Sequence, residues 1–205
     1  MTISQSVKFL EEAFVALNKE YFENALPTAI ITIQSSPKAY GHFTFAKVWE
    51  DGQRKTAYHE INLSAEALTR PIAEVICTLL HEMVHFYCAE CDIQDTSRGG
   101  TYHNSRFKSE CEARDLSVKF SEKYGHAHTE PTQALKSFCT RQHWRNKLTI
   151  SRSGGVGGED PKPKTKKPSS TRKYICPCCG QSIRATKEVN ILCIDCNAQM
   201  EKETA

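Results

Sequence analysis

The segment His81-Glu82-Met83-Val84-His85 places two imidazoles and one carboxylate at a spacing that could support metal chemistry. Residues four apart in an α-helix lie on one face about one turn apart, so both imidazoles could reach a single ion. Zinc is the usual metal for such a pair, and the glutamate between the histidines is suited to act as a general base. The alternative is one satisfied core histidine and one surface histidine.

The setting of this segment favours a metal site. Pro71 suits a first helical position, where its missing N–H has no intrahelical partner to lose. An apolar pattern of helical period then runs through the segment. Its members are Ile72, Val75, Ile76, Leu79, Leu80, Met83 and Val84. Polar groups on such a buried helix would carry a desolvation cost unless something compensates them.

A catalytic zinc usually has three protein ligands and one open position, so a third ligand is expected. His103 is the best candidate, because Gly99-Gly100 shortly before it can reverse the chain and bring it back to the helix. Cys91 follows the second histidine by six residues, but no glycine turns the helix towards the metal there. Glu110 and Glu112, on the predicted helix that follows, could also serve as the third ligand.

The cysteines near the C-terminus form a second potential metal site. Two Cys-x-x-Cys pairs separated by thirteen residues indicate a structural zinc bound by four thiolates. The expected ligands are Cys176, Cys179, Cys193 and Cys196. Cys178 is then a spare thiol, because using it would shorten the first chelate. A module of about thirty residues cannot bury enough apolar surface alone, so the metal would supply its folding energy.

The charge distribution predicts a polyanionic partner. The net charge of the chain is +3, yet residues 136–173 contain eleven Lys or Arg against two acids, a local net charge of +9. Basic and aromatic residues alternate near the start of this region, which is typical of contacts with bases and phosphates. The candidate nucleic-acid contacts are Arg141, Trp144, Arg145, Lys147, Lys164, Lys166 and Lys167. An alternative is that Trp144 packs inwards from an amphipathic helix.

Periodicity and turn signals predict a mixed α+β architecture. Helices are expected over residues 4–23, 71–90, 104–124 (ended by Gly125) and 132–148, and strands over 29–33, 42–49 and 55–63 with a hairpin at Asp51-Gly52. Together they predict a catalytic domain over residues 1–150. A flexible basic linker is expected over 151–173 and a zinc ribbon over 174–205.

The N-terminus has charged residues where a signal peptide needs an apolar run, and no stretch has eighteen consecutive apolar residues. We therefore expect a cytoplasmic protein with no membrane partner. Ten cysteines without a signal sequence are better explained by metal binding than by disulfides.

With these motifs the chain resembles the SprT-like metalloprotease family, which includes the Spartan-type proteases of DNA–protein crosslinks. The resemblance is carried by His-Glu-x-x-His, a loop, and then His103 with Phe107 opening a helix. The run Ile61-Asn62-Leu63-Ser64, the N-terminal helix, the basic linker and the ribbon fit the same layout. One departure is Asn104-Ser105-Arg106, where family members often have a Gly-Pro-Glu-like stretch.

The resemblance implies a zincin-like fold, His81, His85 and His103 as ligands of a catalytic zinc, and Glu82 as the general base. It also implies a structural zinc in the ribbon, a protein substrate and DNA as a partner. Two alternatives stay open: a non-proteolytic factor that binds nucleic acid and acts in transcription, and a metalloprotease that cleaves one specific regulator.

Overall fold

The computed structural model describes residues 1–36, 38–153 and 171–203. Contacts between residues divide the chain into two units, Met1–Gly158 and Glu159–Ala205. Residues 154–170, which include most of the predicted linker and Lys164, Lys166 and Lys167, lie outside the described residues.

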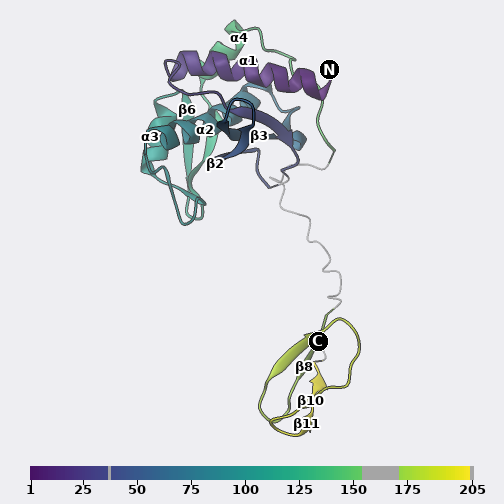
Figure 1. Ribbon diagram of the computed structural model, residues 1–205. Coiled ribbons are helices and arrows are strands. Elements are labelled where there is room, and N and C mark those ends of the chain that lie inside the picture. The colour runs from purple at the N-terminus through teal and green to yellow at the C-terminus, as the bar shows by residue number, and fades with distance from the viewer. Residues whose placement is uncertain (37, 154–170, 204–205) are drawn as a thin grey trace. The chain divides into compact units, whose positions relative to one another are not determined.

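The larger unit has an α+β fold, as predicted (Figure 1). Its helices are α1 (Ile3–Tyr21), α2 (Ile72–Glu90), α3 (Ser105–Glu112) and α4 (Gln133–Arg141), with a 3₁₀ turn at Ala65–Ala67. One sheet has the strand order β1-β3-β2 and contains β1 (Ile30–Gln34), β2 (Gly41–Asp51) and β3 (Thr56–Ser64). The other has the order β4-β5-β7-β6 and contains β4 (Thr96–Ser97), β5 (Tyr102–His103), β6 (Leu116–Ser121) and β7 (Gly125–Pro131).

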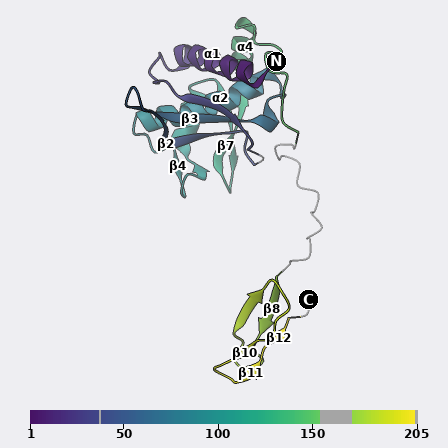
Figure 2. The ribbon, with the colours of Figure 1, turned by 45° about the vertical axis from the view of Figure 1, so that its right-hand side comes forward.

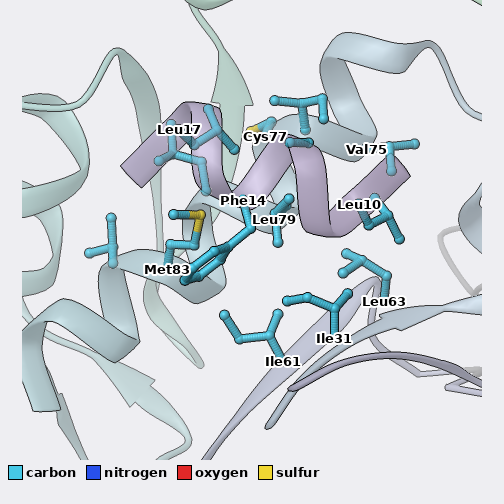
Figure 3. Close-up of a cluster of buried hydrophobic side chains, with 14 of the residues drawn as sticks. Leu10, Phe14, Leu17, Ile31, Ile61, Leu63, Val75, Cys77, Leu79 and Met83 are labelled. Carbon is cyan, nitrogen blue, oxygen red and sulfur yellow. The ribbon is translucent and has the colours of Figure 1, made fainter. Parts of the chain in front are cut away.

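Helix α2 is the central element of this unit. It contacts β2 and β3 of the first sheet, β7 of the second, and the other three helices. Figure 2 shows α1 on the opposite side of α2 from β7. Leu79 and Met83 are fully buried against Leu10 and Leu17 from α1 and Ile61 from β3 (Figure 3). Among the described helices only α2 is long and apolar enough to cross a membrane. However, 67% of its most apolar 18-residue stretch is buried inside this unit.

The N-terminal half of this unit follows the sequence expectation closely. Helix α1 begins with a capping box, in which Thr2 accepts a hydrogen bond from Gln5 N and the Gln5 side chain accepts one from Thr2 N. Strand β3 pairs antiparallel to β2, as the predicted hairpin requires. On its other edge it pairs parallel to β1. The pairing of β2 shifts between Thr44 and Trp49, so the strand bulges beside the helix.

The sequence predicts one helix over residues 104–124, and this prediction is wrong beyond residue 112. Helix α3 ends at Glu112, the chain reverses at Asp115 with a φ of 60°, and β6 then pairs antiparallel to β7. Leu116, Val118 and Phe120 alternate with polar residues, a period of two that suits a strand. The predicted helix over 132–148 is likewise shorter, because His143 and Asn146 adopt positive φ after α4 ends.

Gly125 begins β7 instead of ending a helix. Its φ is +66°, and a Cβ atom at this position would lie 2.1 Å from the backbone oxygen of His103. Only glycine therefore lets β7 pair this closely with β5, where His103 and Gly125 are in register.

The smaller unit has two small sheets. One consists of β8 (Arg172–Ile175), β9 (Ser182–Ala185) and β12 (Glu201–Lys202) in the order β12-β8-β9, and the other pairs β10 (Leu192–Cys193) with β11 (Ala198–Gln199). Among its described residues, the buried core consists of Tyr174, Cys176, Cys193 and Met200.

We expect Gly125→Ala to destabilise the larger unit by roughly 2 kcal/mol or more, because alanine disfavours positive φ and its Cβ would overlap the backbone of β5. Gly52→Ala is the matched control, since a Cβ there meets no atom within 4 Å. Urea unfolding of both variants measures the difference. Equal midpoints for the two would show that β5 and β7 do not need the close approach.

Candidate metal centre and active-site cleft

The structure brings His81, His85 and His103 together. Their ligand atoms all lie within 4.8 Å of one another, and the Nε2 atoms of His85 and His103 are 3.0 Å apart. Two nitrogens on one tetrahedral zinc would be separated by about 3.3 Å, given zinc–nitrogen distances of about 2.0–2.1 Å. The donor set therefore fits a zinc ion. The first two histidines come from α2 and the third from β5.

The imidazole of His85 is oriented by a buried carboxylate. Its Nδ1 lies 2.5 Å from Oδ2 of Asp95, a residue that is only 2% exposed. This hydrogen bond leaves Nε2 directed towards His103. The backbone oxygen of Asp95 also accepts a hydrogen bond from Asn104 N, so the same residue holds the chain next to the third histidine. A carboxylate behind a histidine ligand fixes its ring and raises its basicity.

The other two histidines have weaker support behind them. Nδ1 of His81 lies 3.1 Å from the hydroxyl of Thr129 on β7, while Nδ1 of His103 is buried without a hydrogen-bond partner among the described residues. All three rings contact the fully buried ring of Phe107 at centroid distances of 4.4 to 4.8 Å. Asn104 caps α3 by accepting hydrogen bonds from the N–H groups of Arg106 and Phe107, which places this ring.

Burial favours the neutral form of His81 and His103, the form in which an imidazole binds a metal. It lowers the pKa of His81 well below its usual value, and the neighbouring His85 and His103 act in the same direction. The pKa of His103 falls to about 4, mainly through burial and then through His85. Neutral rings have free lone pairs, so the site is prepared to coordinate a cation.

Glu82 lies in the wall of a cleft of about 1120 Å³ that is also lined by the three histidines. Burial raises the pKa of its carboxyl to about 7, although His85 and the backbone of Phe43 act against this shift. A Cβ at Gly41 would lie 3.1 Å from Oε1 of Glu82 and 2.9 Å from the backbone oxygen of Asn62. Glycine at this position thus lets β2 pass directly over the carboxylate.

The competing candidates for the third ligand lie elsewhere. Cys91 is exposed at the end of α2. Glu110 is 2.6 Å from Arg114, and Glu112 is 2.6 Å from Lys108, so both carboxylates are engaged in ion pairs. None of the three belongs to the histidine cluster.

The four predicted cysteine ligands of the smaller unit also come together. Cys176, Cys179, Cys193 and Cys196 have their sulfur atoms within 4.8 Å of one another, whereas Cys178 is exposed and outside the group. Hydrogen bonding from the backbone N–H groups of Cys179 and Cys178 lowers the pKa of Cys176 to about 6. The approach of the four sulfur atoms fits a structural zinc site, and the thiolate form is favoured at Cys176.

The prediction that Trp144 contacts nucleic acid is wrong. This residue is only 6% exposed and packs edge-on against Phe9 and Phe138. It packs inwards, as the alternative expected, but from the segment that follows α4 and not from a helix. Arg145 and Lys147 are exposed beside it, and Arg141 lies 3.4 Å from Glu20. The basic residues near α4 therefore remain at the surface while the aromatic ring belongs to the core.

Sequence reasoning missed the supporting residues. Asp95, Thr129 and Gly41 are distant in sequence from the histidines and glutamate they serve, and none has a spacing that reveals its role. His42 and His128 fit no ligand pattern in the sequence, yet both line the cleft. Phe107 was noted in the sequence only as part of the family resemblance, and its contact with all three imidazoles was not predicted.

The fold and site define an α+β domain in which three histidines that could hold a metal ion and one glutamate line an open cleft. The model of the SprT-like family matches residues 10–116, more than half of the 205 residues, and the chain belongs to that family. The match includes all three histidines and Glu82 and ends before the cysteine cluster. The family is associated with zinc metalloprotease-type activity. No curated protein matches the chain.

We expect the purified protein to contain two zinc ions, one for each cluster. His103→Ala should lose one equivalent because it removes a ligand, whereas Cys91→Ala should retain both. Metal analysis under non-chelating conditions measures the content. The reverse pattern would move the third ligand to Cys91.

Asp95→Asn should weaken zinc binding to the histidine cluster by about 10- to 100-fold, because the ring of His85 loses its charged partner. Thr129→Val is the control and should weaken it less, since it removes only a neutral hydroxyl from His81. Competition with a chromogenic chelator measures both affinities. A larger loss in Thr129→Val would contradict the ranking.

Proposed function

We propose that the protein is a zinc-dependent endopeptidase with a zincin-like catalytic domain. The observation that carries this proposal is Glu82, a buried carboxyl with a pKa raised to about 7, in a cleft beside the three clustered imidazoles. A general base works best when its pKa is near the operating pH. A purely structural metal site has no use for such a group.

The roles of the residues follow from their placement. His81, His85 and His103 would hold the zinc, and Asp95 and Phe107 would keep their rings in position. A zinc ion here supplies Lewis acidity and makes water nucleophilic near neutral pH. Glu82 would accept the proton of that water on its carboxylate and donate it to the nitrogen of the leaving amine. The cleft is large enough for an extended peptide segment.

We further propose that the substrates are DNA-bound or crosslinked proteins and that the protein acts in the cytoplasm. Support for a DNA partner comes from the local charge of +9 over residues 136–173, with Arg145 and Lys147 exposed. The four-cysteine unit, if it folds as a Spartan-type zinc ribbon, would add a second contact. A protease with one specific regulator as substrate is the competing proposal, because the cleft alone does not select between them.

Glu82→Gln should retain both zinc equivalents and the fold but lose hydrolysis of a protein substrate by several orders of magnitude, because the amide cannot take up the proton. Gel-based proteolysis with parallel metal analysis measures this. Undiminished cleavage by the zinc-loaded variant would rule out Glu82 as the base. Retained DNA binding without any wild-type proteolysis would favour the non-proteolytic nucleic-acid-binding factor.

DNA binding should weaken steeply with salt, with a log–log slope of about −0.9 per phosphate contact on duplex and about −0.7 on single strands. Deleting residues 151–205 should reduce both affinity and slope while the histidine site keeps its zinc, because the ligand sets do not overlap. The deletion should also slow cleavage of a DNA-bound protein more than that of a free peptide, since tethering raises the local concentration only of the former.

Fluorescence anisotropy across a salt series measures binding. A truncated form that binds DNA as tightly as the full chain would remove the C-terminal region from the proposal. A full chain that does not bind DNA at low salt would favour the protease with a single regulator as its substrate.

A further inference from the structure

Arg70 lies in the same cleft as Glu82, just before α2 begins, and its guanidinium is fixed on several sides. Nε donates a hydrogen bond of 3.1 Å to the backbone oxygen of Ala67, and Nη2 donates one of 2.8 Å to the hydroxyl of Thr78. The ring of Tyr40 lies against the guanidinium, 3.8 Å from ring centroid to Cζ. The charged group is therefore held in one place before any ligand arrives.

Most of the donors of this guanidinium have no acceptor among the described residues. An arginine has five N–H donors, and two of them have an acceptor here. The only ion pair of Arg70 in the described parts of the chain is with Glu74, whose oxygen is 4.0 Å from Nη1, beyond hydrogen-bond distance. The Arg70 side chain is 20% exposed, whereas that of Glu74 is 45% exposed. A largely desolvated cation is thus compensated by a distant and hydrated carboxylate.

The position of Arg70 relative to the general base follows from α2. Thr78 and Glu82 are four residues apart on one face of this helix, so they are separated by about 6 Å along its axis. A Cβ at Gly41 would touch both side chains, so they border one stretch of the cleft. Since an extended peptide rises about 3.3 Å per residue, a substrate that ran along α2 from Glu82 would bring the side chain two or three residues from the scissile bond to the guanidinium.

We propose that Arg70 is a specificity-determining residue that binds the side-chain carboxylate of an acidic substrate residue two or three positions from the scissile bond. The inference rests on the proposed peptidase function. A preorganised guanidinium with N–H groups left over from its own fold can accept a carboxylate in a two-point, charge-assisted contact. The Tyr40 ring stacks on the face of the guanidinium, and the Thr78 hydroxyl accepts a hydrogen bond from Nη2 at its edge.

Other cations of the cleft are less suited to this role. Lys38 and Lys136 also line it, but both are exposed. A hydrated ammonium on a flexible chain attracts anions without fixing their position, and salt screens the attraction. A preference for an acidic residue at one defined position therefore points to Arg70.

The experiment uses the zinc-loaded full chain and a series of peptides that differ only in the position of a single glutamate. Each peptide is paired with its glutamine counterpart. We expect one position, two or three residues from the cleavage site, at which glutamate raises kcat/KM about tenfold over glutamine. Arg70→Gln should abolish that preference, and Arg70→Lys should retain only part of it because lysine lacks the two-point geometry.

Glu74→Gln tests the same idea without touching the hydrogen bonds that Arg70 makes to its own fold. It removes the competing carboxylate and should increase the glutamate preference. Lys136→Gln is the charge-matched control and should leave the position of the preference unchanged. An equal preference in wild type and Arg70→Gln, or no preference in a wild type that cleaves the peptides, would overturn the proposal.

Binding measurements separate this inference from the proposed function. The same peptides, labelled with a fluorophore, are bound to zinc-loaded Glu82→Gln and to Glu82→Gln combined with Arg70→Gln. A position-specific glutamate preference in binding that is lost in the double variant supports the Arg70 site. It does so even if wild type cleaves none of the peptides, because absent cleavage counts only against the peptidase assignment. Equal binding of both peptide series refutes the Arg70 site even if cleavage is normal.

Discussion

The central constraint on this structure is the burial of polar groups on a core helix. Helix α2 supplies fully buried leucine and methionine side chains to the core and, on another face, two imidazoles and a carboxylate that are themselves mostly buried. Desolvation at these positions must be offset by specific partners. Asp95, Thr129 and the ring of Phe107 are the partners of the imidazoles, and each comes from a different segment of the second half of the domain.

This requirement explains why the second half of the domain is folded tightly against α2. The chain from α2 to β7 passes the site several times, first at Asp95, then at His103 and finally at Thr129. The pairing of Thr96 with His103 and of His103 with Gly125 fixes these passes relative to one another. Small displacements in this sheet would therefore move a ligand or its support, so the precision of the site depends on backbone pairing as much as on the ligands themselves.

The parts of this arrangement that depend on local pattern could be predicted from the sequence. The apolar period through α2, the extent of α1 and the hairpin between β2 and β3 were all readable because each signal lies within a short stretch. The strands β6 and β7 were not predicted, because the alternation at Leu116, Val118 and Phe120 is too short to outweigh the helix expected there, and pairing with β7 decides between the two. Asp95 and Gly41 could not have been identified, since the need for a carboxylate or for a missing Cβ arises only where distant segments meet.

The two candidate metal sites stand in different relations to folding. The histidine cluster lies against a core of about thirty buried residues that is formed by helices and sheets from the whole domain, so apolar burial supports the elements that carry its ligands. The cysteine cluster contributes Cys176 and Cys193, two of the four buried core residues described in its own unit. With so little apolar burial, metal coordination would have to supply most of the stability there. The larger unit can thus present an open site suited to chemistry. The smaller unit would be organised around its ion, which suits a structural role.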